Sequence, residues 1–296
     1  MSAGKRAIGV ERKRMVTALA CLLLLAPPIP PPMFHRDIGP GWDVAAKTLT
    51  IQDREVSFQL LIPDGEPDED LAIHFHGAAW FAIDEHVARG LRGPLIVFNN
   101  GQGSSVYRAP FEDRTRLARW IRLVEEAVRA RGRRDYRVRT VSITSFSAGY
   151  GAVREIVRDP EQWKRVRCIL LLDSMYASYA ADEKVPEPSQ IDVWVPFVRS
   201  AMAGERTFVF TYSQVPTDTY ANSTACARAL ARAAGMAMEP VERGTLSATL
   251  DAQFPLLERA DAGGAHLWGY GGEDAQAHMT HARHLADVWE SVHGRT

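Results

Sequence analysis

The chain has 296 residues, of which 46% are hydrophobic, so it can form a full globular core in one large domain or two small ones. Its net charge of −1 at pH 7 does not favour nucleic acid or an anionic membrane as a partner. The three cysteines, Cys21, Cys168 and Cys226, are too few for a disulfide framework, and we expect the last two to be buried thiols.

Residues 1–26 have the pattern of an export signal. Five basic side chains between Lys5 and Arg14 precede an apolar stretch, Met15 to Ala26, that is short for a membrane span. No Ala-x-Ala cleavage site follows this stretch. We therefore expect an exported protein, periplasmic or secreted. An uncleaved anchor that associates with the membrane and a cytoplasmic leader are the alternatives.

Residues 27–45 contain many prolines and are predicted to be a stiff linker outside the core. Ordered structure is expected from about residue 45, and residues 46–296 are predicted to form one domain. The domain begins with a predicted hairpin, in which residues 47–52 and 56–62 alternate between apolar and polar side chains.

Beyond the hairpin, apolar strands alternate with amphipathic helices. Strands are predicted at residues 71–76, 94–98, 137–144, 166–172, 206–211 and 265–270. Helices are predicted at residues 111–131, 149–158, 220–234 and 277–292. Because the strands are apolar throughout, they predict an α/β fold of three layers, with a mostly parallel sheet covered on both faces. Residues 174–204 are expected to lie over the strand ends as a small lid.

The helix predicted at residues 111–131 has one apolar face, which includes Trp120 and Val124. Its other faces carry many arginines, such as Arg116 and Arg119, and are predicted to be exposed to solvent. Nucleic-acid binding is not expected there, because no aromatic side chains interleave with the basic ones.

Polar residues follow the predicted strands at the points where ligands of an open α/β sheet bind. His76, Ser147, Asp173 and His278 each follow a different strand or its loop. Ser147 lies in the sequence SFSAGYG, between a β-branched strand and a helix, with Ser145 in place of the first glycine of Gly-x-Ser-x-Gly. The alternative is a turn in which Ser147 only caps the helix.

In this order of motifs, residues 46–296 resemble a serine hydrolase of the α/β-hydrolase superfamily. The resemblance implies the α/β-hydrolase fold, a nucleophile at Ser147 on a sharp strand-to-helix turn, and no required cofactor. The nucleophile of this family has a strained backbone, so its neighbours must be small. Gly149 and Gly151 meet that demand, and Ser145 is a tolerable departure.

A serine hydroxyl needs a base, and the base needs a carboxylate to orient it. The resemblance implies His278 as the base, with His281 as the alternative, because both follow the last strand. Asp173 is the preferred acid because it directly ends a strand and is held more rigidly than Asp218, the alternative in a later loop. His284 is expected on the surface.

The oxyanion hole needs two backbone N–H groups. By the same resemblance, Ala148 supplies one, and Ala78, or alternatively Ala79, supplies the other from the loop after His76-Gly77. Trp80 and Phe81 either wall the acyl pocket or pack in the core.

The loop between residues 99 and 107 is rich in glycine and polar residues and is expected to face the site. Gln102 and Tyr107 are its candidate substrate contacts.

The sequence thus predicts a hydrolase that cleaves a small carboxylic ester through an acyl-enzyme. Amide or peptide hydrolysis uses the same residues and stays open, as does a secreted, non-catalytic binding protein on the same scaffold. A metal hydrolase is also weighed, because His74 and His76 share a strand. However, Ala78 stands where metallo-β-lactamase-like enzymes need aspartate, so no metal site is predicted.

Overall fold

A computed structural model describes residues 27–36, 47–180, 184–242 and 253–294, and the structural statements below refer to these. The strands are β1 Thr48–Asp53, β2 Val56–Leu61, β3 Asp70–Phe75, β4 Leu95–Phe98, β5 Thr140–Phe146, β6 Val166–Leu172, β7 Thr207–Tyr212, β8 Glu239–Pro240, β9 Leu256–Ala262 and β10 Ala265–Tyr270. The helices are α3 Ala79–Ala88, α4 Ser104–Phe111, α5 Arg116–Ala130, η1 Ser147–Gly149, α6 Tyr150–Val157, η2 Gln162–Arg165, α7 Pro188–Asp192, α8 Val195–Met202, α9 Ser223–Ala234, α10 Ala275–Arg283 and α11 Leu285–His293.

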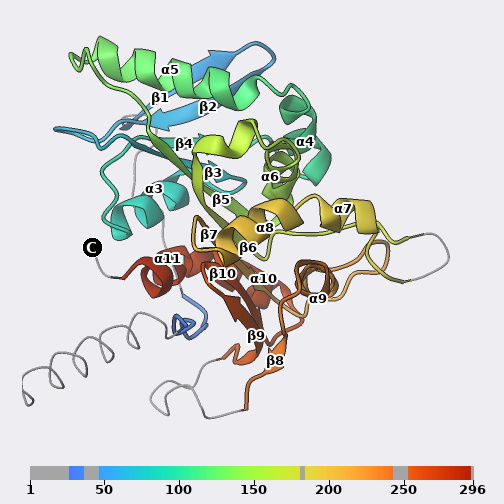
Figure 1. The fold of residues 1–296 in the computed structure, drawn as a ribbon. Coiled ribbons are helices and arrows are strands. Elements are labelled where there is room, and N and C mark those ends of the chain that lie inside the picture. Colours follow the sequence, from blue (N-terminus) through green and yellow to red (C-terminus); the bar gives the residue numbers. More distant parts are fainter. Residues whose placement is uncertain (1–26, 37–46, 181–183, 243–252, 295–296) are drawn as a thin grey trace, which may run out of the picture.

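All ten strands form one sheet in the order β1-β2-β4-β3-β5-β6-β7-β10-β9-β8 (Figure 1). The central strands from β4 to β10 are parallel, whereas β1 and β2 at one edge and β9 and β8 at the other are antiparallel. This is the α/β-hydrolase fold that the sequence predicts. Within the described residues, no helix is both long and apolar enough to cross a membrane.

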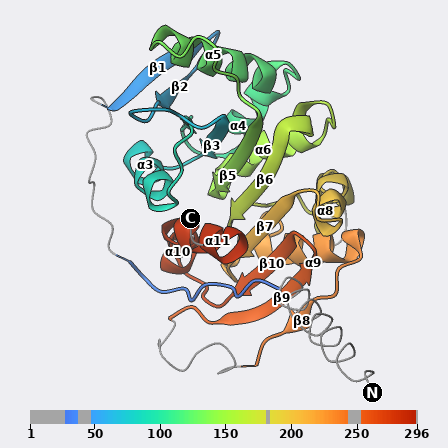
Figure 2. The same cartoon turned by 60° about the vertical axis from the view of Figure 1, so that its left-hand side comes forward.

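The sheet is covered by helices on both faces because alternate residues of each strand point to opposite sides. On β6, Ile169 and Leu171 belong to the core beneath α4 to α9. Leu170 and Leu172 belong to a second core with residues of α3, α10 and α11. Figure 2 shows α3, α10 and α11 together on one side of the sheet and α6, α8 and α9 on the other.

The hairpin, the six parallel strands and the buried thiols of Cys168 and Cys226 are confirmed. Five features differ from the prediction. The chain forms α3 directly after Ala78, an edge strand at β9, and two helices, α10 and α11, in place of one. The predicted lid is wrong in its second half, because α8 packs against the sheet face at β7 and β10. Arg116 is not solvated but 2% exposed, and it is paired with Asp53.

The proline-rich segment is packed against the second core, so the prediction of a free linker is wrong for residues 27–36. Met33 is fully buried and pairs with Phe254, whose N–H donates to the Met33 carbonyl at 3.1 Å. The Tyr270 hydroxyl donates to the carbonyl of Pro31 at 2.9 Å. In Figure 2 this segment, which we call the N-terminal strap, runs along α10 and β9.

A buried carboxylate joins α3 to α11 across the second core. Glu85 is 5% exposed and accepts a hydrogen bond from the N–H of Ala286, at the start of α11, at 2.6 Å. Burial raises the pKa of Glu85 to about 7, although the bond from Ala286 and the charge of Arg89 lower it. Between pH 4.5 and about 7, the folded protein therefore keeps a proton on Glu85 that the unfolded chain has lost.

We expect Met33→Ala to reduce the free energy of unfolding by about 2–5 kcal/mol, because it removes a fully buried side chain. Denaturant unfolding measures this change. Ile29→Ala in the same strap is the matched control, since Ile29 is 73% exposed and its truncation should have little effect. If both variants changed the free energy of unfolding by the same amount, the packing of the strap would be contradicted.

The raised pKa of Glu85 predicts that stability falls as the pH rises from 4.5 towards about 7. Over this range the folded state holds more protons than the unfolded state, so each pH unit removes up to about 1.4 kcal/mol. Glu85→Gln keeps an acceptor for the Ala286 N–H but does not titrate, so it should flatten this slope. Unfolding curves at several pH values test this, and an unchanged slope in the variant would contradict it.

Candidate active site

Three residues with a strained backbone end three neighbouring strands. His76 follows β3, Ser147 follows β5 and Asp173 follows β6, and these strands are adjacent in the sheet. Their φ angles are 68°, 48° and 43°, in the left-handed region that residues other than glycine rarely adopt. Since parallel strands end at the same edge, the three side chains gather where an α/β sheet binds its ligands.

The turn at Ser147 has no room for larger neighbours. A Cβ atom on Gly149 would lie 2.4 Å from the carbonyl oxygen of Phe75, and one on Gly151 would lie 2.2 Å from that of Ser104. These contacts confirm the predicted demand for small residues after the serine.

Ser145 does more than occupy the place of a glycine. Its hydroxyl lies 2.7 Å from that of Ser174, which in turn donates to the backbone carbonyl of Ser147 at 2.8 Å. Ser145 and Ser174 are both fully buried. This chain of hydrogen bonds connects the strained turn to the end of β6.

Asp173 and His278 are in direct contact. The Asp173 side chain is fully buried, and its Oδ2 lies 2.7 Å from Nδ1 of His278. Oδ2 also accepts from the Ser213 hydroxyl at 2.6 Å, while Oδ1 accepts from the Ser213 N–H at 3.1 Å and from the Ser223 hydroxyl. Burial alone would raise the pKa of Asp173. The hydrogen bond from His278 outweighs this effect, together with the charges of His281 and His278 and the bond from Ser213. The pKa of Asp173 is therefore held well below its ordinary range.

The bond to Asp173 fixes the tautomer of His278. An ionised carboxylate only accepts, so Nδ1 carries the proton and Nε2 presents its lone pair. The imidazole is 21% exposed and stacks on Phe146, the residue before Ser147, with ring centroids 4.6 Å apart. The histidine is therefore oriented by Asp173 on one side and by the end of β5 on the other.

The alternative acid and base lie elsewhere. His281 is 1% exposed, its Nδ1 lies 2.9 Å from the Thr211 hydroxyl, and burial lowers its pKa to about 4. Asp218 is exposed, and within the described part of the chain no hydrogen bond joins it to a histidine. His284 is fully buried, contrary to the prediction, and it bonds Asp287 and the strap.

The candidate oxyanion donors sit at the starts of two helices. Ala148 lies in η1, directly after Ser147. Ala78 is the N-cap residue of α3 and Ala79 its first residue, so these N–H groups have no acceptor within the helix. The presence of α3 here was not predicted.

A cavity of about 150 Å³ lies between the loop after β3, the start of α3 and α10. Its walls include Trp80, Phe81 and Phe146, so both predicted aromatic residues line it. Gln102 is exposed on the loop after β4 and is not part of this cavity.

The proposed substrate contact by Tyr107 is wrong. Its side chain is fully buried, and its hydroxyl lies 2.7 Å from Nδ1 of His76 and 3.0 Å from Oδ1 of Asn99. Tyr107 therefore orients the imidazole of His76 through this hydrogen bond from the protein interior. The polar and glycine-rich sequence around it gives no signal for this role.

The histidines considered for a metal do not converge. His74 is 1% exposed and bonds Thr144 and the carbonyl of His76, whereas His76 bonds Tyr107. Across the described ranges, no group of three or more His, Cys, Asp or Glu side chains is arranged to hold a metal ion.

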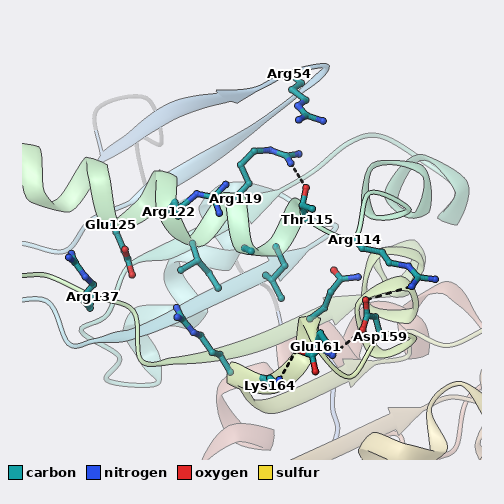
Figure 3. A pocket seen from close by; sticks show the side chains of 15 residues that line it. Arg54, Arg114, Thr115, Arg119, Arg122, Glu125, Arg137, Asp159, Glu161 and Lys164 are labelled. Carbon is teal, nitrogen blue, oxygen red and sulfur yellow. Dashed lines mark hydrogen bonds and ion pairs between the residues drawn. The ribbon is translucent and has the colours of Figure 1, made fainter.

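A larger groove, of about 830 Å³, lies on another part of the molecule (Figure 3). It is lined by residues of α5 and η2 and by Arg137 and Arg165, which precede β5 and β6, so it lies at the opposite strand ends from Ser147. Figure 3 shows Lys164 beside Glu161, its ion-pair partner three residues earlier on the same turn. The groove is therefore an arginine-rich surface away from the strained residues, where Arg54, Arg114, Arg119 and Lys164 form ion pairs with carboxylates.

No family model and no curated protein matches the sequence. Solved structures with a similar fold include an esterase of the bacterial hormone-sensitive lipase (HSL) family, with 14% identity, a TM-score of 0.48 and 84% of each chain covered. Carboxylesterase CesB (YbfK) from Bacillus subtilis has 9% identity and a TM-score of 0.46, with 83% of this chain and 90% of that chain covered. Glucuronoyl esterase from Solibacter usitatus has 10% identity and a TM-score of 0.41, with 80% and 77% covered.

Ser213→Ala should lower the free energy of unfolding by about 1.5–3 kcal/mol at pH 7, because it removes a donor to a buried carboxylate. The pKa of Asp173 is depressed in the folded state, well below the ordinary aspartate value of 3.8, so this stabilisation is present at pH 7 and is lost only as the pH falls through that depressed folded-state pKa. The loss caused by the variant should therefore shrink in acid.

Unfolding curves from pH 7 down to the most acidic pH at which the protein still folds measure this effect, with Ser57→Ala, an exposed serine on β2, as the control. A loss that grows as the pH falls would show that the Ser213 hydroxyl does not act through the charge of Asp173.

Proposed function

We propose that the protein is a serine hydrolase that cleaves small carboxylic esters through an acyl-enzyme. The observation that carries the proposal is the 2.7 Å bond between the buried Asp173 and His278, beside the strained turn that holds Ser147. A buried acid, an oriented imidazole and a partly exposed strand-end serine are the three parts of a nucleophilic triad.

Acylation begins when Nε2 of His278 takes the proton of the Ser147 hydroxyl and Oγ bonds to the carbonyl carbon of the ester. The carbonyl oxygen gains the electron pair and is stabilised by the N–H groups of Ala148 and of Ala78 or Ala79. When the tetrahedral intermediate collapses, the bond to the alcohol oxygen breaks. His278 returns its proton to this oxygen, and the alcohol leaves.

Deacylation repeats these steps with water. His278 takes a proton from the water as its oxygen bonds to the acyl carbon, then returns the proton to Oγ as the Ser147 ester bond breaks. Asp173 stays ionised throughout and stabilises the imidazolium, which explains why a charge can form next to the aromatic ring of Phe146.

The substrate is proposed to be a small ester, because the adjoining cavity measures only about 150 Å³. Hydrolysis of an amide or peptide by the same residues is the second candidate. Export, or membrane association, is proposed from the sequence alone, because residues 1–26 lie outside the described residues.

Ser147→Ala should reduce kcat/KM for 4-nitrophenyl acetate by about 10⁴- to 10⁶-fold, and His278→Ala by a similar amount. Both variants should also lose labelling by a fluorophosphonate probe, whereas Ser57→Ala should keep both properties. Asp173→Asn should be strongly impaired and Asp218→Asn active.

An ester rate that persists in Ser147→Ala would refute the proposal, and so would an unlabelled, folded wild-type protein. Comparison with 4-nitroacetanilide separates esterase from amidase activity.

A further inference from the structure

The cavity beside the site has one charged wall. Of its nine lining residues, only Arg283 carries a permanent charge. The cavity is lined by the His-Gly loop and by Phe146, the residue before Ser147, and also by Ala282 and Arg283 in the last turn of α10. An acyl group bound to Ser147 can therefore extend towards a guanidinium.

The charge of Arg283 is not balanced by an acidic side chain. Its Nη1 lies 2.6 Å from Nδ1 of His35 in the strap, and within the described ranges no carboxylate forms an ion pair with it. The neighbouring Arg36, by contrast, pairs with Asp287. Arg283 thus retains donors for an outside anion, and the planar guanidinium fork matches a carboxylate.

The size of the cavity limits what can reach this arginine. A protein cavity of roughly 150 Å³ holds a molecule the size of benzene, which has about six non-hydrogen atoms. Three methylene groups and one carboxylate have the same number. The aromatic and apolar walls suit the methylene groups, and the arginine suits the terminal charge.

We propose that the substrate is a monoester of a short dicarboxylic acid, and that Arg283 selects it by binding the free carboxylate. This inference rests on the proposed function, because it assigns the acyl group of the same reaction. The distal carboxylate remains unchanged while the ester bond is cleaved.

The test compares two methyl esters of equal size, monomethyl glutarate and methyl 5-methylhexanoate, by titrating the acid released at neutral pH. In the second ester a neutral isopropyl group replaces the carboxylate. Wild type should show the higher kcat/KM for monomethyl glutarate.

Arg283→Met should lower kcat/KM for monomethyl glutarate by about ten- to a hundredfold while changing that of the neutral ester by less than about twofold. Arg283→Lys keeps the charge but not the planar fork of the guanidinium. Its kcat/KM for monomethyl glutarate should lie between those of wild type and Arg283→Met. Arg92→Met is the matched control, because Arg92 is a 73% exposed arginine that pairs with Asp68, and it should behave as wild type. Arg283→Gln, with melting curves, replaces the methionine variant if the latter does not fold.

If wild type cleaves both esters equally, or if Arg283→Met and Arg283→Gln slow both to the same extent, the carboxylate assignment is wrong and the proposed function stands. If wild type cleaves neither of these esters nor 4-nitrophenyl acetate, and the probe does not label Ser147, the proposed function fails and this inference fails with it.

Discussion

The site depends on a backbone constraint at the ends of β3, β5 and β6. His76, Ser147 and Asp173 all have φ between 43° and 68°, which costs about 1–3 kcal/mol per residue and persists only where the surroundings enforce it. Gly149 lets the chain pass against β3, and the buried Ser174 hydroxyl holds the Ser147 carbonyl. The sheet core thus enforces three strained turns at the ends of adjacent strands.

The second requirement is a negative charge inside the protein. A carboxylate with no exposed surface is strongly destabilised unless donors surround it. Asp173 receives bonds from His278, from both donors of Ser213 and from Ser223. Three of these four donors are uncharged, so the aspartate can remain ionised while His278 is neutral. The imidazole then has its lone pair free, as a general base needs.

The sequence predicts the parts of this arrangement that are local. Strand ends, the turn at Ser147 and the preference for Asp173 over Asp218 follow from apolar runs and from the rigidity of a strand end. Helix α3 gave no such signal, because its N-cap residue is Ala78, which has no side chain that can cap a helix. Tyr107 likewise reads as a loop residue, since its partner His76 is 31 positions away. Contacts between distant segments are not encoded in local periodicity.

The position of the N-terminal strap also depends on contacts between distant segments, and these contacts involve the proposed selectivity residue. Its prolines predict an extended segment correctly, but not the surface on which the segment lies. Three consecutive strap residues contact the end of α10 and the start of α11: Phe34 bonds His284, His35 bonds Arg283, and Arg36 pairs with Asp287. These partners lie about 250 positions later in the chain. Because α10 carries both His278 and Arg283, this segment helps to place the proposed base and the proposed selectivity residue. The strained strand ends therefore arise from local sequence, whereas the position of α10, with His278 and Arg283, depends on contacts between the two ends of the domain.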